Sequence, residues 1–149
     1  MEKLPFLTWE PSYSYHVEVI DAQHRKLFDM VNHLIDVFEA PRDGDSSDLL
    51  PVLNELVEYV SVHFHQEEII MADAEYPDFL SHNWEHRKFA NEVLKFLKDY
   101  KEGNADLGLN ILVFLVGWVR NHVTTSDVQC AEYLFKNPEK LKLFPVVIN

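Results

Sequence analysis

Seven residues of types that bind metal ions recur along this 149-residue chain at spacings that suit helices. They are five histidines and two carboxylates: His24, His63, Glu67, His82, His86, His122 and Asp127. Residues four positions apart on a helix project from one face about a turn apart, which holds for His63 with Glu67 and for His82 with His86. Imidazole binds transition metals and a carboxylate can bridge two ions, so the set predicts a dinuclear metal centre.

The step from His122 to Asp127 does not fit a regular helix. Five residues on a continuous α-helix would turn two side chains about 140° apart, since each residue turns about 100°. The residues between them include Thr124, Thr125 and Ser126, whose side chains often cap helix termini. We therefore expect the helix to break after His122 and to restart at Asp127, which would bring both side chains inward.

The remaining histidines serve as an internal control. His65 follows His63 by two residues and His33 follows His24 by nine, which places both near the opposite faces of their helices. We expect both side chains to be solvated. His16 lies in the N-terminal segment and has no periodic partner.

For any single histidine on an apolar face, an ordinary core position with one hydrogen bond is the commoner explanation. That explanation fails for all seven residues together, because unpaired buried polar groups cost about 1–3 kcal/mol each. A metal removes this cost. Without thiolates, the ligand types favour a pair of iron or manganese ions over a structural zinc. The HExxH pattern of zinc proteases and the Glu-x-x-His pattern of ferritin-like bundles are both absent.

The segments that contain these residues have apolar side chains at helical spacing, and no alternating strand pattern is present. The sequence predicts an all-α fold, an antiparallel up-down-up-down four-helix bundle. One helix should begin near Asp21, and Ser46 or Ser47 should cap the next. The helical segments, with a short C-terminal piece last, are expected at residues 21–39, from the cap at 46 or 47 to 73, from a first turn that includes Pro77 to 100, and at 111–122 and 128–135.

We expect a single domain over residues 1–149, since a chain of this length can bury a substantial core. Within it, residues 1–20 form an N-terminal arm, 21–135 the bundle and 136–149 a C-terminal tail. Three aromatic residues should anchor the arm across the bundle: Trp9, Tyr13 and Tyr15. The apolar tail needs a surface to cover, and it is a candidate for self-association or for binding a protein partner.

The net charge excludes some partners. Acidic residues outnumber basic ones 25 to 13, and a net charge of -12 would repel nucleic acid and anionic membrane surfaces. One cysteine, Cys130, permits no intramolecular disulfide. No signal-peptide core and no long apolar stretch is present. We therefore expect a cytoplasmic protein with neither nucleic acid nor membrane as a partner.

Four motifs resemble the ligand motifs of the hemerythrin family, especially its bacterial members: IDAQH at 20–24, HFHQEE at 63–68, YPDFLSHNWEH at 76–86 and WVRNHVTTSD at 118–127. The resemblance implies two iron ions (Fe2+/Fe3+) with a bridging oxo or hydroxo group. The first ion would take three histidines, His82, His86 and His122. The second would take His24 and His63 and keep one open position. The two carboxylates, Glu67 and Asp127, would bridge both ions.

The resemblance also implies the function, which is reversible dioxygen binding for storage, delivery or buffering, with no enzymatic activity. It places an apolar pocket around the open position, formed by Leu27, Phe64, Trp118, Val119 and Val123. Sensing of oxygen, nitric oxide or redox state for a protein partner is the alternative function. Turnover of peroxide or nitric oxide is a third, but it would need a polar group in this pocket, and the sequence offers no clear candidate.

Overall fold

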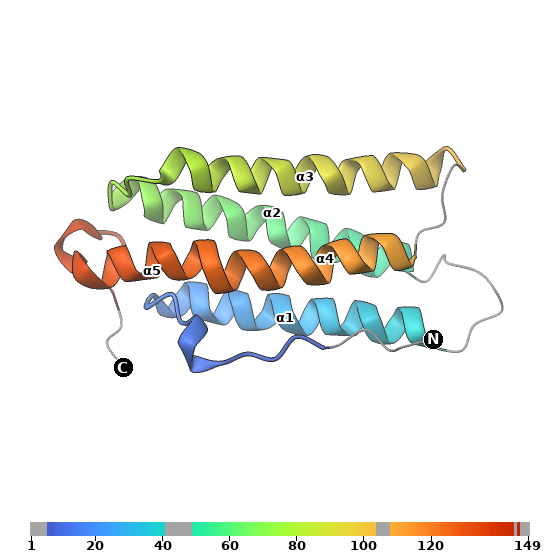
Figure 1. Cartoon of the computed structure of the whole chain (residues 1–149), viewed down its shortest axis with the longest axis horizontal. Helices are drawn as coiled ribbons and strands as arrows, with labels where there is room; N and C mark the ends of the chain where they lie inside the picture. Colours follow the sequence, from blue (N-terminus) through green and yellow to red (C-terminus); the bar gives the residue numbers. More distant parts are fainter. Residues whose placement is uncertain (1–5, 41–48, 104–107, 145, 147–149) are drawn as a thin grey trace.

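The computed structural model describes residues 6–40, 49–103, 108–144 and 146. These residues form helices and contain no strand. The α-helices are α1 (Glu18–Glu39), α2 (Leu49–Asp73), α3 (Phe79–Lys101), α4 (Leu109–Asn121) and α5 (Asp127–Lys136). A π-helical segment, His122–Ser126, joins α4 to α5, so that the two form one long member of the bundle (Figure 1). The predicted all-α four-helix bundle is confirmed.

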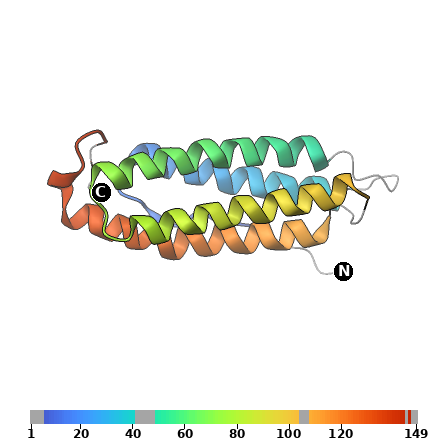
Figure 2. The ribbon, with the colours of Figure 1, turned by 90° about the horizontal axis from the view of Figure 1, so that it is seen from above.

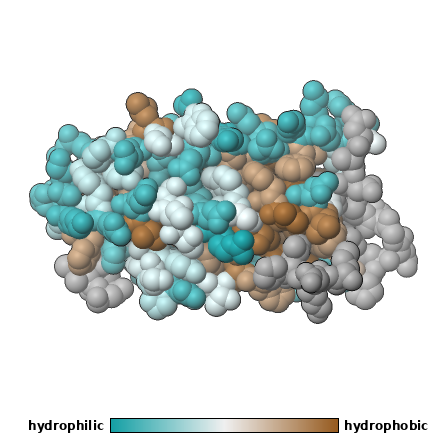
Figure 3. All heavy atoms as spheres, in the orientation of Figure 1, coloured by the Kyte–Doolittle hydropathy of each residue, from teal (hydrophilic) through white to brown (hydrophobic). Residues whose placement is uncertain are grey.

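Consecutive members of the bundle run antiparallel, and each contacts two neighbours. Helix α1 packs against α2 and α4, while α3 packs against the same two helices (Figure 2). Hydrophilic side chains cover much of the face in Figure 3, with hydrophobic surface over α4, where Leu109 and Val113 are exposed. Among the described residues, no helix has both the length and the apolar composition of a membrane span.

Two separate hydrophobic clusters fill the interior, and the histidines lie between them. Along α1, Ile20 belongs to one cluster, His24 follows, and Leu27 belongs to the other. The same order recurs on α2, where Val60 lies in the Leu27 cluster and Ile70 in the Ile20 cluster, on either side of His63 and Glu67. The apolar residues that predict the helices therefore also determine where the histidines lie along the length of the bundle.

Helix α1 begins at Glu18, three residues earlier than expected. Asp21 lies inside the first turn and is buried, because it accepts hydrogen bonds from the arm instead of capping the helix. Its Oδ1 accepts from the Tyr15 backbone N–H at 2.6 Å, and its Oδ2 accepts from the Ser14 hydroxyl at 2.7 Å. The expected cap of α2, Ser46 or Ser47, lies outside the described residues.

The described part of the N-terminal arm lies across the bundle. The ring of Trp9 lies 5.7 Å from that of Phe28, and the ring of Tyr13 packs on the same Phe28 at 6.3 Å. Tyr15 is fully buried, with its ring 6.0 Å from that of His24 and its hydroxyl 3.0 Å from the sulfur of Cys130. The arm therefore covers one side of the histidine cluster.

The C-terminal tail returns to the end of the bundle. Leu141, Phe144 and Val146 pack into the cluster that contains Ile20. The backbone N–H groups of residues 142 and 143 donate to Oδ2 of Asp73 at 2.7 and 3.0 Å. These apolar residues thus cover a surface of their own chain, and self-association through the tail stays a prediction.

Candidate metal centre

The structure brings all seven predicted ligands together in the interior of the bundle, near the ends at which α1 and α3 begin. Each is at most 4% exposed. Helix α1 contributes one of them, α2 and α3 two each, and the fourth member of the bundle the last two: His24; His63 and Glu67; His82 and His86; His122 and Asp127. His33 and His65 are exposed, as expected, and His16 is half-buried beside Phe135.

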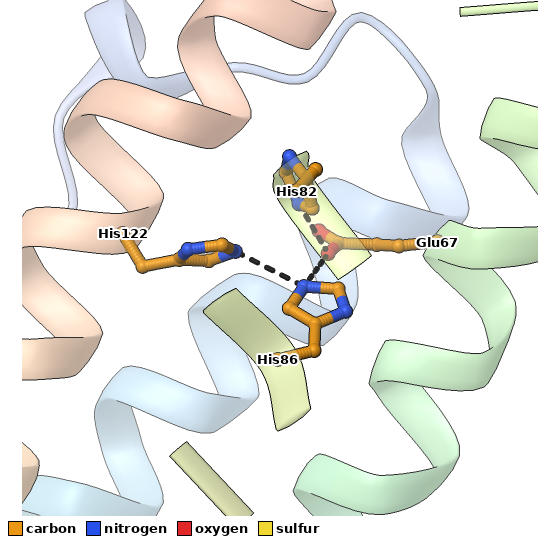
Figure 4. A group of neighbouring side chains, drawn as sticks. All are labelled: Glu67, His82, His86 and His122. Atoms are coloured by element: carbon orange, nitrogen blue, oxygen red, sulfur yellow. Dashed lines mark hydrogen bonds and ion pairs between the residues drawn. The ribbon is translucent and has the colours of Figure 1, made fainter. Parts of the chain in front are cut away.

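The carboxylate of Glu67 lies between two groups of imidazoles, and Figure 4 shows it beside His82 and His86. Its Oε2 is 3.1 Å from Nε2 of His24 and 3.2 Å from Nε2 of His63. Its Oε1 is 3.5 Å from Nε2 of His82 and 3.1 Å from Nε2 of His86. One oxygen therefore faces the histidines of α1 and α2, and the other faces those of α3.

Asp127 divides its oxygens in the same way. Its Oδ2 lies 3.1 Å from Nε2 of His24, and its Oδ1 lies 3.1 Å from Nε2 of His82 and 3.2 Å from Nε2 of His122. The Nε2 atoms of His86 and His122 are 3.1 Å apart. Both carboxylates thus have the placement that a bridge between two ions requires.

Two sets of donor atoms lie close enough together to hold a metal ion each. One set is Glu67, His82, His86 and His122, and the other is His24, His63, Glu67 and Asp127. Two ligands at right angles, each about 2.1 Å from an ion, would lie roughly 3 Å apart, which is close to the separations above. The donor atoms are therefore spaced like the ligands of two neighbouring coordination spheres.

The hydrogen bonding of the seven side chains is incomplete in a way that suits cations. Glu67 Oε1, both oxygens of Asp127 and Nε2 of His82 are buried without a hydrogen-bond partner among the described residues. Buried carboxylates and imidazoles in this state are costly. The same atoms are the ones that point at the centre of the cluster, so two metal ions fit this donor set.

The five-residue step from His122 to Asp127 is bridged by a π-helical turn and not by the expected break. The backbone N–H of Asp127 donates to the carbonyl of His122, five residues earlier, which aligns the two side chains on one face. Thr124 and Thr125 do not cap a new helix. Their hydroxyls donate to the carbonyls of Arg120 and Asn121, four residues before them.

The charges of the cluster are tightly coupled. Burial opposes a charge on His24, but the negative charges of Asp127 and Glu67, each with an oxygen 3.1 Å from its Nε2, outweigh burial and raise the pKa of His24 to about 10. Asp127 likewise outweighs burial to raise the pKa of His82 to about 10 and that of His122 to about 9. Without a metal, protons on imidazoles therefore balance the carboxylates, and cations would take the place of these protons.

Two polar residues outside the predicted set hold histidines of the cluster. Nδ1–H of His63 donates to Oε1 of Gln23 at 2.8 Å. Nδ1 of His122 lies 3.3 Å from Oε1 of Glu85, and the hydroxyl of Ser126 donates to both oxygens of that carboxylate. The hydrogen bond to His122 lowers the pKa of Glu85. Such partners orient a metal-binding imidazole through its second nitrogen.

Sequence reasoning missed both residues. Gln23 precedes His24 directly, and Glu85 precedes His86, so each lies about 100° around its helix from a predicted ligand. The carboxamide and the carboxylate meet their histidines only because α2 and the π-helical segment pack beside them. The sequence contains no signal for these contacts beyond the adjacency to a ligand motif.

Among the five apolar residues expected near the open position, the two aromatic ones contact histidines of the cluster. Four are buried, and Trp118 is half-buried. The ring of Phe64 stacks on His86 with centroids 3.7 Å apart, and the ring of Trp118 stacks on His122 at 4.4 Å. The others, Leu27, Val119 and Val123, belong to the same hydrophobic cluster as Phe64.

Comparisons with known proteins agree with this site. Residues 15–129 match the family model described as hemerythrin HHE cation binding domain. The chain is 31% identical to bacteriohemerythrin of Methylococcus capsulatus over 125 residues, which cover 83% of this chain and 93% of that protein. It is 30% identical to a hemerythrin-like protein of Naegleria gruberi over 125 residues, covering 84% and 90% of the two chains.

A solved structure shares the fold. The crystal structure of wild-type hemerythrin superimposes with a TM-score of 0.78 at 30% sequence identity, covering 87% of this chain and 98% of that chain. The matched region contains all seven candidate ligands, since the family model extends from residue 15 to residue 129. The chain belongs to the hemerythrin family.

Proposed function

We propose that this chain binds dioxygen reversibly at a di-iron centre. In the proposed assignment, the histidines of α3 and of the π-helical segment bind one ion: His82, His86 and His122. The histidines of α1 and α2, His24 and His63, bind the other. The two buried carboxylates bridge the ions, beside a bridging oxo or hydroxo group. The family to which the chain belongs and the two donor sets support this assignment.

The proposal rests on the unequal number of histidines assigned to the two ions, three for one and two for the other. Both carboxylates have an oxygen directed at each group of imidazoles, so each could serve as a ligand to both ions. The ion with two histidines then has one protein ligand fewer than the ion with three. When bound, a pair of iron ions would supply a free coordination position and two electrons for dioxygen.

The surroundings favour reversible binding over turnover. Phe64 and Trp118 place aromatic carbons against the cluster, and Leu27 packs one turn from His24. A dry, apolar pocket keeps water and proton donors away from a reactive ligand, and this suppresses side reactions. Gln23 contacts Nδ1 of His63, and Glu85 contacts Nδ1 of His122. These contacts leave Nε2 of each imidazole directed at the centre of the cluster.

Spectroscopy of the reduced, iron-loaded protein tests this function. On mixing with air, the protein should develop a visible charge-transfer band, and the band should disappear again under vacuum. Rapid irreversible oxidation would count against reversible binding and would favour sensing or turnover. A metal content of zinc without iron would contradict the di-iron assignment.

Single substitutions test the assignment of the ligands. His122→Ala should lower metal affinity far more than His65→Ala, because the first imidazole faces the cluster and the second is exposed. Both variants remove the same atoms from a helical histidine, so His65→Ala is a matched control. Equal losses of metal in the two variants would refute the assignment.

A further inference from the structure

A recess of about 130 Å3 lies between α2 and α3, beside the candidate metal centre. Its walls are mostly apolar side chains: Val57, Val60, Phe64, Phe89, Val93 and Leu94. Two small residues complete the lining, Ser61 from α2 and Ala90 from α3. The recess plays no part in the ligand set described above.

The recess has a buried floor and an open mouth. Val60, Phe89 and Val93 are at most 2% exposed and form its depth. Ser61 and Ala90 are exposed at its mouth, where their short side chains leave the space between the helices unfilled. A larger residue at either position would close the mouth.

The side chains that line the recess favour an apolar guest over water. The hydroxyl of Ser61 donates to the carbonyl of Val57 at 3.1 Å, so its proton is already engaged within α2. A buried water needs about two to four polar partners, and this lining does not supply them. Enclosed apolar cavities of roughly 150 Å3 stay dry and bind apolar guests such as xenon, and the buried depth of this recess has the same kind of lining. The recess therefore suits a small apolar molecule.

Phe64 connects the recess to the candidate centre. Its ring forms part of the wall and stacks on His86 at a centroid distance of 3.7 Å and an interplanar angle of 4°. The same ring, Ser61 and Ala90 also line a groove on the α2–α3 surface that reaches His86. A guest in the recess is thus separated from a candidate ligand by one aromatic ring.

We propose that this recess binds a small apolar gas molecule of the dioxygen class and delivers it past Phe64 to the centre. The binding step stands on the recess itself and needs no metal. The delivery step rests on the proposed function. The small residues at Ser61 and Ala90 are then the determinants of access.

Xenon is the probe for the binding step. Titrating the full chain with xenon, with and without metal, should cause saturable shifts of the Val60 and Val93 methyl resonances in NMR spectra. Ala90→Phe should abolish these shifts by filling the mouth, and Ser61→Leu should do the same from the opposite helix. Ala22→Phe places the same ring on an exposed position of α1 and should leave the shifts intact.

The outcomes separate the two steps. Absence of xenon shifts at Val60 and Val93 in the unaltered chain, or shifts that survive both blocking substitutions, would overturn the gas site. In the reduced, iron-loaded protein, Ala90→Phe should slow dioxygen association and dissociation by the same factor. Unchanged rates would overturn delivery alone. If the unaltered chain binds no dioxygen, the proposed function and delivery fail, and the xenon titration still decides the gas site.

Discussion

Nε2 of His122 lies 3.2 Å from Oδ1 of Asp127, although five residues separate them along the chain. The π-helical turn between them makes this contact possible, because its hydrogen bond joins residues five apart. Inserting an alanine after Thr125 should separate the two ligands by six residues, which on an α-helix turns Asp127 away from His122 by roughly 120°. The variant should remain helical by circular dichroism but lose bound metal, as measured by elemental analysis.

The matched control for the insertion is Thr125→Ala. It removes the hydroxyl that donates to the Asn121 carbonyl but keeps the length of the segment. It should retain metal and lose no more than about 1 kcal/mol of unfolding free energy. If the insertion variant binds as much metal as the control, the π-helical turn is not what aligns the two ligands.

Glu85 should act as a positioning residue for His122. Glu85→Ala removes the acceptor at Nδ1 of His122 and leaves the Ser126 hydroxyl without its partner. Loss of such a contact typically lowers metal affinity about 10- to 100-fold. Competition with a chelator under anaerobic conditions would measure the change for Fe2+. Glu92→Ala, which removes a half-buried carboxylate from the same helix, should leave the affinity unchanged.

The helical phase of the ligands was predictable from sequence because backbone geometry fixes which residues share a face. His24 and His63 are buried while His33 and His65 are exposed, as their spacing predicts. The apolar stripes gave the helices for the same reason. These inferences depend only on local structure, which the sequence of one segment determines.

Contacts between segments were not predictable in this way. Glu85 of α3 contacts His122 of the π-helical segment, and Tyr15 contacts Cys130, which lies 115 positions later in the sequence. The π-helical turn was misread as a break, since Thr124 and its neighbours favour caps as strongly as they favour hydrogen bonds to carbonyls four residues earlier. Which of these contacts forms depends on packing that a single sequence does not reveal.

The metal-free protein should be less stable in alkaline solution. Its Asp127 raises the pKa of His82 to about 10 and that of His122 to about 9, each from an ordinary value of 6.5. A raised histidine pKa contributes stability that is fully present below pH 6.5 and is lost as the pH rises through 9 to 10. Denaturant midpoints of the metal-free chain should therefore fall over this range.

The metal-loaded chain is the control for this prediction. Metal ions require deprotonated imidazoles, so the loaded centre does not depend on these protons. Its denaturant midpoint should change little where that of the metal-free chain falls. Metal binding near neutral pH should also release protons, which calorimetry in buffers of different ionisation enthalpy would detect. Parallel midpoints in the two forms, with no proton release, would contradict the charge balance described above.

The C-terminus of α2 contains a position that favours glycine. The N–H of Tyr76 donates to the carbonyl of Met71, and the N–H of Glu75 donates to that of Ala72, which is the Schellman arrangement. Glu75 adopts φ 55° there, a left-handed conformation that costs a residue with a Cβ about 1 kcal/mol or more. Its side chain is exposed, so the cost brings no contact in the core.

Glu75→Gly should therefore stabilise the protein. The substitution keeps the backbone carbonyl that accepts from the Tyr133 hydroxyl and removes the Cβ that opposes the left-handed conformation. A gain of about 1 kcal/mol would raise the melting temperature by roughly 2–4 °C for a chain of this size. Glu75→Ala, which removes the charge and keeps the Cβ, should leave the melting temperature nearly unchanged. If alanine stabilises as much as glycine, the gain comes from removing a negative charge from an acidic chain and not from the backbone.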